Sequence, residues 1–253
     1  MIATKAASLF LRRSAPRFVN NNSVRAMSSS SSDSVTFDLT GSFETHNLDT
    51  APNNTITMSK SELLSHFELM YTMRRMEITC DNEYKARNIR GFCHLYDGQE
   101  AVATGIQYAL DQGDSWATSY RCHCVALARG GTVSKVVGEL FGAIDGYSKG
   151  KGGSMHMYNK KENFYGGAGI VGAQVPLGAG TAFANKYKAK PGEPMNVAIA
   201  CYGDGAANQG QIWESANMCN LWKLVRCSKR RRSQDWNERE QNNSQSYFTI
   251  LLL

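Results

Sequence analysis

The sequence lacks several patterns that would assign a chain of this length to a common functional class. None of its seven cysteines forms a C-x-x-C pair, which excludes the usual zinc knuckles and dithiol redox motifs. No stretch approaches the roughly 18 apolar residues that a membrane-spanning helix needs. The glycine-rich segments match neither G-x-x-x-x-G-K-[ST] nor G-x-G-x-x-G after a strand, so a common nucleoside-triphosphate or dinucleotide loop is not indicated.

Acidic residues are also missing from one end of the chain. The first 32 residues hold five Lys or Arg and no acid, and residues 225–253 hold six bases against three acids. The net charge of +6 therefore belongs to the two ends, and the body between them is close to neutral. A nucleic-acid-binding reading rests only on the run "KRRR" at 229–232, with no aromatic platform beside it, and we expect no nucleic-acid partner.

The N-terminal segment 1–32 has the composition of a targeting sequence. It is rich in Arg and Ser and carries Leu9, Phe10 and Leu11 near its start, which is typical of a mitochondrial transit peptide. A basic tail is the alternative. Residues 33–58 are rich in Ser, Thr, Asn and Asp with few apolar anchors, so we expect a flexible lead-in, with order beginning near Ser59. These segments predict a protein of the mitochondrial matrix.

Periodic patterns predict an α/β fold. Ser59 and Glu62 form a capping box that predicts a long helix, with Leu63, Phe67 and Met70 at helical spacing and a Met stripe in the core. Further helices are expected through 101–109 and 134–141 and over "QVPLGAGTAFANKYK". The short apolar run in "NVAIACYGD" (196–204) is typical of a buried parallel strand. The expected architecture is a parallel sheet flanked by helices.

Two glycine-rich stretches indicate a ligand site. In "YGDGAANQG", Asp204 follows the predicted strand between two glycines, at the sheet edge where α/β proteins bind ligands. A carboxylate there suits Mg²⁺ that is shared with a substrate's phosphates. The alternative is that "GDG" is a tight turn that binds no ligand. Residues 148–180 form a long glycine-rich segment, which we expect to be a loop that wraps a ligand. The cluster Cys122-His123-Cys124 is too tightly spaced for a zinc finger and indicates a strand-to-helix turn with reduced thiols.

Five separated motifs together resemble one family. "GFCHLYDGQEA" (91–101), "TSYRCH" (118–123), "GKGGSMHM" (150–157), "NFYGGAGIVGAQVPLGAG" (163–180) and "YGDGAANQGQIWE" (202–214) occur in the order found in the alpha subunit of mitochondrial pyruvate dehydrogenase (acetyl-transferring). The resemblance covers roughly residues 57–224. The branched-chain 2-oxo acid relative fits less well at "FCHLYDGQEA" and "GGSMHM". The resemblance implies a thiamin-diphosphate-binding fold.

It also assigns roles to individual residues. Asp204 would bind Mg²⁺, and Gly205 and Ala206 would line the diphosphate of thiamin diphosphate. Tyr120 and Arg121 would lie beside the phosphates, and Gly169 and Val171 against the aminopyrimidine. His94 would lie near the substrate, with a core histidine as the alternative reading.

The activity that the resemblance implies is oxidative decarboxylation of pyruvate with acetyl transfer to lipoamide, leading to acetyl-CoA. The expected partners are a beta subunit in a heterotetramer, which supplies the carboxylate that activates the cofactor, and a lipoyl transacetylase. An alternative is a truncated, inactive fragment that binds the beta subunit without turnover.

The resemblance stops after Leu224. The family pattern expects further Mg²⁺ ligands where this chain has Ser233 and Asp235, and the pair Asn242-Asn243 comes ten residues too late. We therefore expect a partial thiamin-diphosphate-binding domain over 59–224, incomplete on its C-terminal side, and a disordered non-family tail over 225–253.

Overall fold

The computed structural model describes residues 26–27, 33–42, 52–190, 195–224 and 250–252. The chain divides into two units, Met1–Leu69 and Met70–Leu253. Most of the expected transit peptide and most of the tail after Leu224 lie outside the described residues, so those two predictions stay untested there.

The first unit contains a three-stranded antiparallel sheet in the order β1-β2-β3. Its strands are β1 (Ala26–Met27), β2 (Ser34–Asp38) and β3 (Thr55–Ser59). Val35 pairs with Met58 and Phe37 with Ile56, and the hydroxyls of Thr36 and Thr57 lie 2.8 Å apart. The expected flexible lead-in therefore contains paired strands, because alternating β-branched and apolar residues on both segments favour pairing over the polar composition around them.

Helix α2 (Lys60–Lys85) begins where the capping box predicted. The Glu62 amide donates to Ser59 Oγ at 3.2 Å, and the Ser59 amide donates to Glu62 Oε2 at 2.7 Å, which satisfies two of the free N–H groups at the helix start. The buried residues of this helix lie in its second half and share one face: Met73, Met76, Glu77 and Cys80. Met73 and Met76 of the Met stripe are confirmed as core and share it with a buried carboxylate, whereas Met70 is half-buried and Phe67 is exposed.

The second unit is built on a parallel sheet in the order β5-β4-β6-β7, which confirms the α/β prediction. Its strands are β4 (Ser115–Ser119), β5 (Phe164–Ala168), β6 (Ala198–Tyr202) and β7 (Ile250–Leu252). Strand β6 is the predicted buried strand. Strand β7 belongs to the segment expected to be disordered, and it pairs with β6 along the edge expected to be incomplete. Ser233, Asp235, Asn242 and Asn243 lie outside the described residues.

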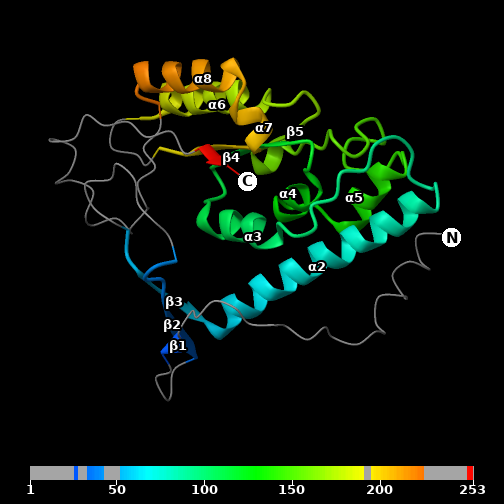
Figure 1. Cartoon of the computed structure of the whole chain (residues 1–253), viewed down its shortest axis with the longest axis horizontal. Helices are drawn as coiled ribbons and strands as arrows, with labels where there is room; N and C mark the ends of the chain where they lie inside the picture. The colour runs from blue at the N-terminus through cyan, green and yellow to red at the C-terminus, as the bar shows by residue number, and fades with distance from the viewer. Residues whose placement is uncertain (1–25, 28–32, 43–51, 191–194, 225–249, 253) are drawn as a thin grey trace. The chain divides into compact units, whose positions relative to one another are not determined.

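Helices cover both faces of this sheet (Figure 1). Helices α6 and α8 lie on one face, and α3, α4 and α5 lie on the other. The helices after α2 are α3 (Glu100–Ala109), α4 (His123–Ala128), α5 (Val133–Leu140), the 3₁₀ turn η2 (Lys160–Glu162), α6 (Gln174–Lys188), α7 (Asp204–Ala207) and α8 (Gly210–Leu221). The three further helices predicted from the sequence are confirmed as α3, α5 and α6.

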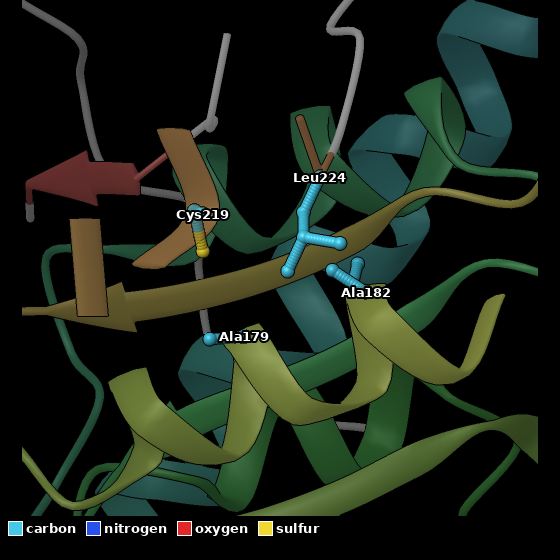
Figure 2. Packing of buried hydrophobic residues seen from close by; sticks show 5 residues of the cluster. Ala179, Ala182, Cys219 and Leu224 are labelled. Carbon is cyan, nitrogen blue, oxygen red and sulfur yellow. The ribbon is translucent and has the colours of Figure 1, made fainter. Parts of the chain in front are cut away.

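Small residues let α6 pack closely on β6 and α8. A methyl group built on Gly178 would lie 2.6 Å from the Cβ of Ala200 in β6, so the helix backbone touches the strand. One buried cluster joins these elements with Leu224 at the end of the described span (Figure 2), and its members are Ala179, Ala182, Ala198, Cys219 and Leu224. This packing fixes where β6 ends and α7 begins, which is where Asp204 lies.

Candidate functional site

The carboxyl ends of three neighbouring strands lie at one edge of the second sheet. Strands β5, β4 and β6 are parallel neighbours and end at Ala168, Ser119 and Tyr202. The predicted cofactor residues follow directly after these ends: Tyr120 and Arg121 after β4, Gly169 and Val171 after β5, and Asp204, Gly205 and Ala206 after β6. The fold thus brings three separate sequence motifs to one edge, where ligands of open α/β sheets bind.

The turn after β6 presents a carboxylate on open backbone. Gly203 is extended (φ −90°, ψ 175°), and Asp204 is the exposed first residue of α7. A methyl group built on Gly203 or Gly205 meets no atom within 4 Å. Ala206, in contrast, is buried and packs with Val175, so its side chain belongs to the core and only its backbone can line a ligand. This turn has room for a diphosphate and one carboxylate for a hard cation.

The segment after β5 is tied to the start of α8. Gly172 has a φ of +88°, which favours glycine, and Gln211 Nε2 donates to the Val171 carbonyl at 3.1 Å. On the other side of the segment, a methyl group built on Gly169 would meet His156 Nε2 at 3.0 Å. The expected ligand-wrapping loop of 148–180 is therefore divided by η2 and β5 and continues into α6, instead of forming one loop.

The turn after β4 gathers His94, Tyr120 and Arg121. The rings of His94 and Tyr120 have centroids 4.6 Å apart, and the guanidinium carbon of Arg121 lies 5.5 Å from the Tyr120 ring centroid. Arg121 Nη1 also donates to the Leu95 carbonyl at 2.6 Å. Burial lowers the pKa of His94, and the positive charge of Arg121 lowers it further. His94 is half-buried beside Tyr120, and its substrate-facing role stays a prediction.

A buried polar chain supports the backbone at His94. His123 Nδ1 lies 3.0 Å from Glu77 Oε1, and His123 Nε2 lies 2.8 Å from Ser154 Oγ. Ser154 Oγ in turn accepts the His94 amide at 3.0 Å. With Nδ1 of His123 donating to a Glu77 oxygen, the other ring nitrogen meets the Ser154 hydroxyl, so the three side chains form one hydrogen-bonded series. The sequence did not predict this series of hydrogen-bonded side chains. Glu77 is 46 residues from His123, His123 is 31 residues from Ser154, and the three belong to no common motif.

A second buried carboxylate organises the glycine-rich segment. Glu139 Oε2 accepts the amides of Ser148 at 2.6 Å and Gly150 at 2.9 Å, and Oε1 accepts those of Gly152 at 2.6 Å and Gly153 at 3.2 Å. Glu139 is fully buried. Glycines that we expected to surround a ligand therefore surround, in part, the Glu139 side chain of the protein itself. The dense glycine spacing was the available signal for such an anion-binding nest.

The cluster at Cys122–Cys124 forms the predicted turn. Cys122 is the N-cap of α4, both cysteines are buried and free, and burial raises the pKa of the Cys122 thiol to about 12. Within the described ranges, no group of three or more His, Cys, Asp or Glu side chains is arranged to hold a metal ion. No helix in the same ranges is long and apolar enough to cross a membrane.

Known proteins resemble the chain over this part of the fold. The family profile described as "Dehydrogenase E1 component" matches residues 68–226. The pyruvate dehydrogenase E1 component subunit alpha, mitochondrial, of Solanum tuberosum is 54% identical over 200 residues, covering 79% of this chain and 50% of that protein. The protein of the same name from Schizosaccharomyces pombe is 55% identical over 182 residues, covering 72% of this chain and 43% of that protein.

The chain thus spans about half the length of the curated relatives it matches. The word "mitochondrial" in the relatives' names supports the mitochondrial matrix as the location of this chain. The matched span contains β4, β5 and β6 and every predicted cofactor residue that follows them. The chain therefore belongs to the dehydrogenase E1 component family.

Proposed function

We propose that this chain acts as the alpha-subunit part of a thiamin-diphosphate-dependent pyruvate dehydrogenase. The reaction is oxidative decarboxylation of pyruvate with acetyl transfer to lipoamide, leading to acetyl-CoA. The observation that carries the proposal is the convergence of three strand ends on one sheet edge, with exposed Asp204 on open backbone directly after β6. The names of the relatives support the choice of pyruvate.

The residues at this edge fit the cofactor. Asp204 would hold Mg²⁺ together with phosphate oxygens, and Gly205 and the Ala206 backbone would lie along the diphosphate. Arg121 is a fixed positive charge beside Tyr120, suited to phosphate oxygens. Gly169 and Val171 would face the aminopyrimidine end. When bound, thiamin diphosphate supplies the carbon nucleophile and the electron sink that decarboxylation of a 2-oxo acid needs.

The chain's own contribution is binding, orientation and control of charge. The lowered pKa of His94 favours a neutral imidazole near neutral pH, which can exchange a hydrogen bond with a substrate carboxylate or carbonyl without adding a second cation beside Arg121. The hydrogen-bonded side chains of Glu77, His123 and Ser154 hold the backbone of His94, because Ser154 Oγ accepts the His94 amide. Glu139 holds residues 148–153 in place. Residues 59–224 would form the cofactor-binding domain.

The partners follow from the relatives. Their names describe one subunit of a component, so we propose a beta subunit and a lipoyl transacetylase as partners of this chain. The carboxylate that activates the cofactor would come from the beta subunit. Binding of a beta subunit without turnover is the competing function, and the same experiment distinguishes the two.

The test is co-expression of the full chain with a pyruvate dehydrogenase beta subunit, followed by assays of complex formation and pyruvate decarboxylation with thiamin diphosphate and Mg²⁺. We expect a complex and turnover that Asp204→Asn abolishes, whereas Glu214→Gln on exposed α8 leaves turnover unchanged. A complex without turnover or cofactor retention would favour the binding function instead. Salt-sensitive retention on DNA with no complex would contradict both.

A further inference from the structure

His156 contacts the predicted cofactor segment but has no role in the site as described so far. A methyl group built on Gly169 would meet His156 Nε2 at 3.0 Å and Cε1 at 3.2 Å. The imidazole edge that carries Nε2 therefore faces the Gly169 backbone. The other ring nitrogen, Nδ1, lies 3.0 Å from the hydroxyl of Tyr158. His156 thus joins Tyr158 to the segment that follows β5.

The contacts of the Tyr158 hydroxyl determine which ring nitrogen of His156 carries the proton. The Tyr158 hydroxyl donates to the Gly167 carbonyl at 3.0 Å, and a phenol has a single proton. Toward His156 the same oxygen can only accept, so Nδ1 carries the proton. Burial raises the pKa of Tyr158, which keeps the phenol protonated at neutral pH. A neutral imidazole has one N–H group, so Nε2, which lies beside Gly169, is left with a lone pair that can accept a hydrogen bond.

Glycine at 166 makes this arrangement possible. Gly166 has a φ of +94°, and a methyl group built on it would overlap the Tyr158 ring. Without a side chain there, the ring lies directly on β5 and its hydroxyl reaches the Gly167 carbonyl. The rings of Tyr158 and His156 are stacked, with centroids 6.3 Å apart and planes inclined by 17°. The strand, the phenol and the imidazole therefore form one connected unit.

We propose that Tyr158 locks His156 in its Nδ1–H tautomer, so that Nε2 is a positioned hydrogen-bond acceptor for an N–H donor of a molecule bound against Gly169. The inference rests on the proposed function, in which that molecule is thiamin diphosphate and the donor is the amino group of its aminopyrimidine. His156 is a positioning residue: it orients the bound molecule and takes no part in bond making. Tyr158 acts through His156.

The first test measures the tautomer in the full chain without any ligand. Long-range ¹H–¹⁵N correlation spectra of ¹⁵N-histidine-labelled protein at pH 8 report which nitrogen of each ring is protonated, and His156→Gln assigns the signal by removing it. We expect the Nδ1–H pattern for His156 and a shift toward the Nε2–H pattern in Tyr158→Phe. Tyr165→Phe, a matched change in β5, should leave the signal as in the unchanged chain. An Nε2–H pattern in the unchanged chain would overturn the lock.

The second test measures the acceptor with thiamin diphosphate and Mg²⁺ as the probe. Titration calorimetry of the chain co-expressed with the beta subunit should give about tenfold weaker binding for His156→Leu, the factor expected for one lost hydrogen bond, and partial recovery for His156→Gln, which keeps an acceptor. The probe should also slow modification of His156 by diethyl pyrocarbonate, read by peptide mass spectrometry.

The two tests separate the inference from the proposed function. Normal probe binding by His156→Leu, with no protection of His156, would overturn the acceptor role while the cofactor assignment survives. An Nδ1–H tautomer together with no probe binding by the unchanged chain in complex with the beta subunit would support the lock and overturn the cofactor as its ligand.

Discussion

The Glu77 carboxylate lies 3.0 Å from His123 Nδ1, and neither side chain has any exposed surface. Glu77 comes from α2 and His123 is the first residue of α4, so the pair connects two helices, and the Cys124 thiol of α4 also donates to Glu77 Oε1 at 3.5 Å. The other end of the pair reaches the His94 amide through Ser154. Because a buried polar group is costly when unpaired, this contact couples the packing of α2 to the position of His94.

Replacing Glu77 by Leu should therefore destabilise the protein. The change leaves His123 Nδ1–H without an acceptor in a buried site, so we expect the free energy of unfolding to fall by about 1.5–3 kcal/mol, the range for hydrogen bonds to charged groups. Chemical denaturation measures the loss. Asp81→Asn is the matched control, because it breaks an exposed pair with Lys85 on the same helix and should cost only about 0.3–0.5 kcal/mol. Equal losses in the two variants would contradict the buried pairing.

Two glycines of α6 should respond to alanine with opposite signs. Gly178→Ala places a methyl group 2.6 Å from Ala200 Cβ, and overpacking of this kind costs about 1–3 kcal/mol. Gly180 has no atom within 4 Å of the same built position, so Gly180→Ala should add about 0.5–1 kcal/mol from helix propensity alone. Thermal melts of the two variants and of the unchanged chain measure the sign of each change in stability. A stabilised Gly178→Ala variant would show that α6 does not pack on β6 this closely.

These contacts also explain which parts of the fold were predictable. Helices α3, α5 and α6 and strand β6 follow from local periodicity, and the capping box at Ser59 located the start of α2. Strand β5 ("FYGGA") was missed, and β4 ("SWATS") was implied only by the strand-to-helix turn predicted at Cys122–Cys124, because small residues and two adjacent glycines weaken a strand pattern. Their extended form depends on pairing with each other and with β6, which is information that a short window does not contain.

The candidate site also contains residues that the sequence predicts and residues that it does not. Asp204 was predicted from a motif after a predicted strand, and Tyr120 and Gly169 from motifs that resemble the family; the structure has each of them after the end of a strand. Glu77 and Glu139 were missed because their partners come from other segments and their own surroundings read as ordinary helix. The sequence therefore predicts residues that can face a ligand better than it predicts the buried residues that hold them.

The charge of Arg121 should be measurable through His94. The pKa of His94 lies below its ordinary value of 6.5, mainly through burial and next through Arg121, so the folded chain binds this proton less readily than the unfolded chain. Arg121→Met removes one of the three causes and leaves burial and the smaller effect of His123, so the midpoint of an NMR titration of His94 should rise toward 6.5 while staying below it. Arg90→Gln removes an exposed charge nearby in sequence and should leave the midpoint in place. A midpoint that falls in Arg121→Met would be inconsistent with the arrangement.

Glu139 provides the sharpest test of how the glycine-rich segment is held. The change Glu139→Gln keeps the shape of the side chain but turns one acceptor oxygen into an amino group, which then faces two backbone amides as a second donor. Two buried N–H groups lose their acceptor at about 1–3 kcal/mol each, so we expect at least ~2 kcal/mol of destabilisation. Faster hydrogen exchange at Gly150 and Gly152 should accompany it, whereas Glu214→Gln on exposed α8 should change neither quantity. If exchange at these glycines stayed as slow as in the unchanged chain, the segment would be held by its own backbone and not by the carboxylate.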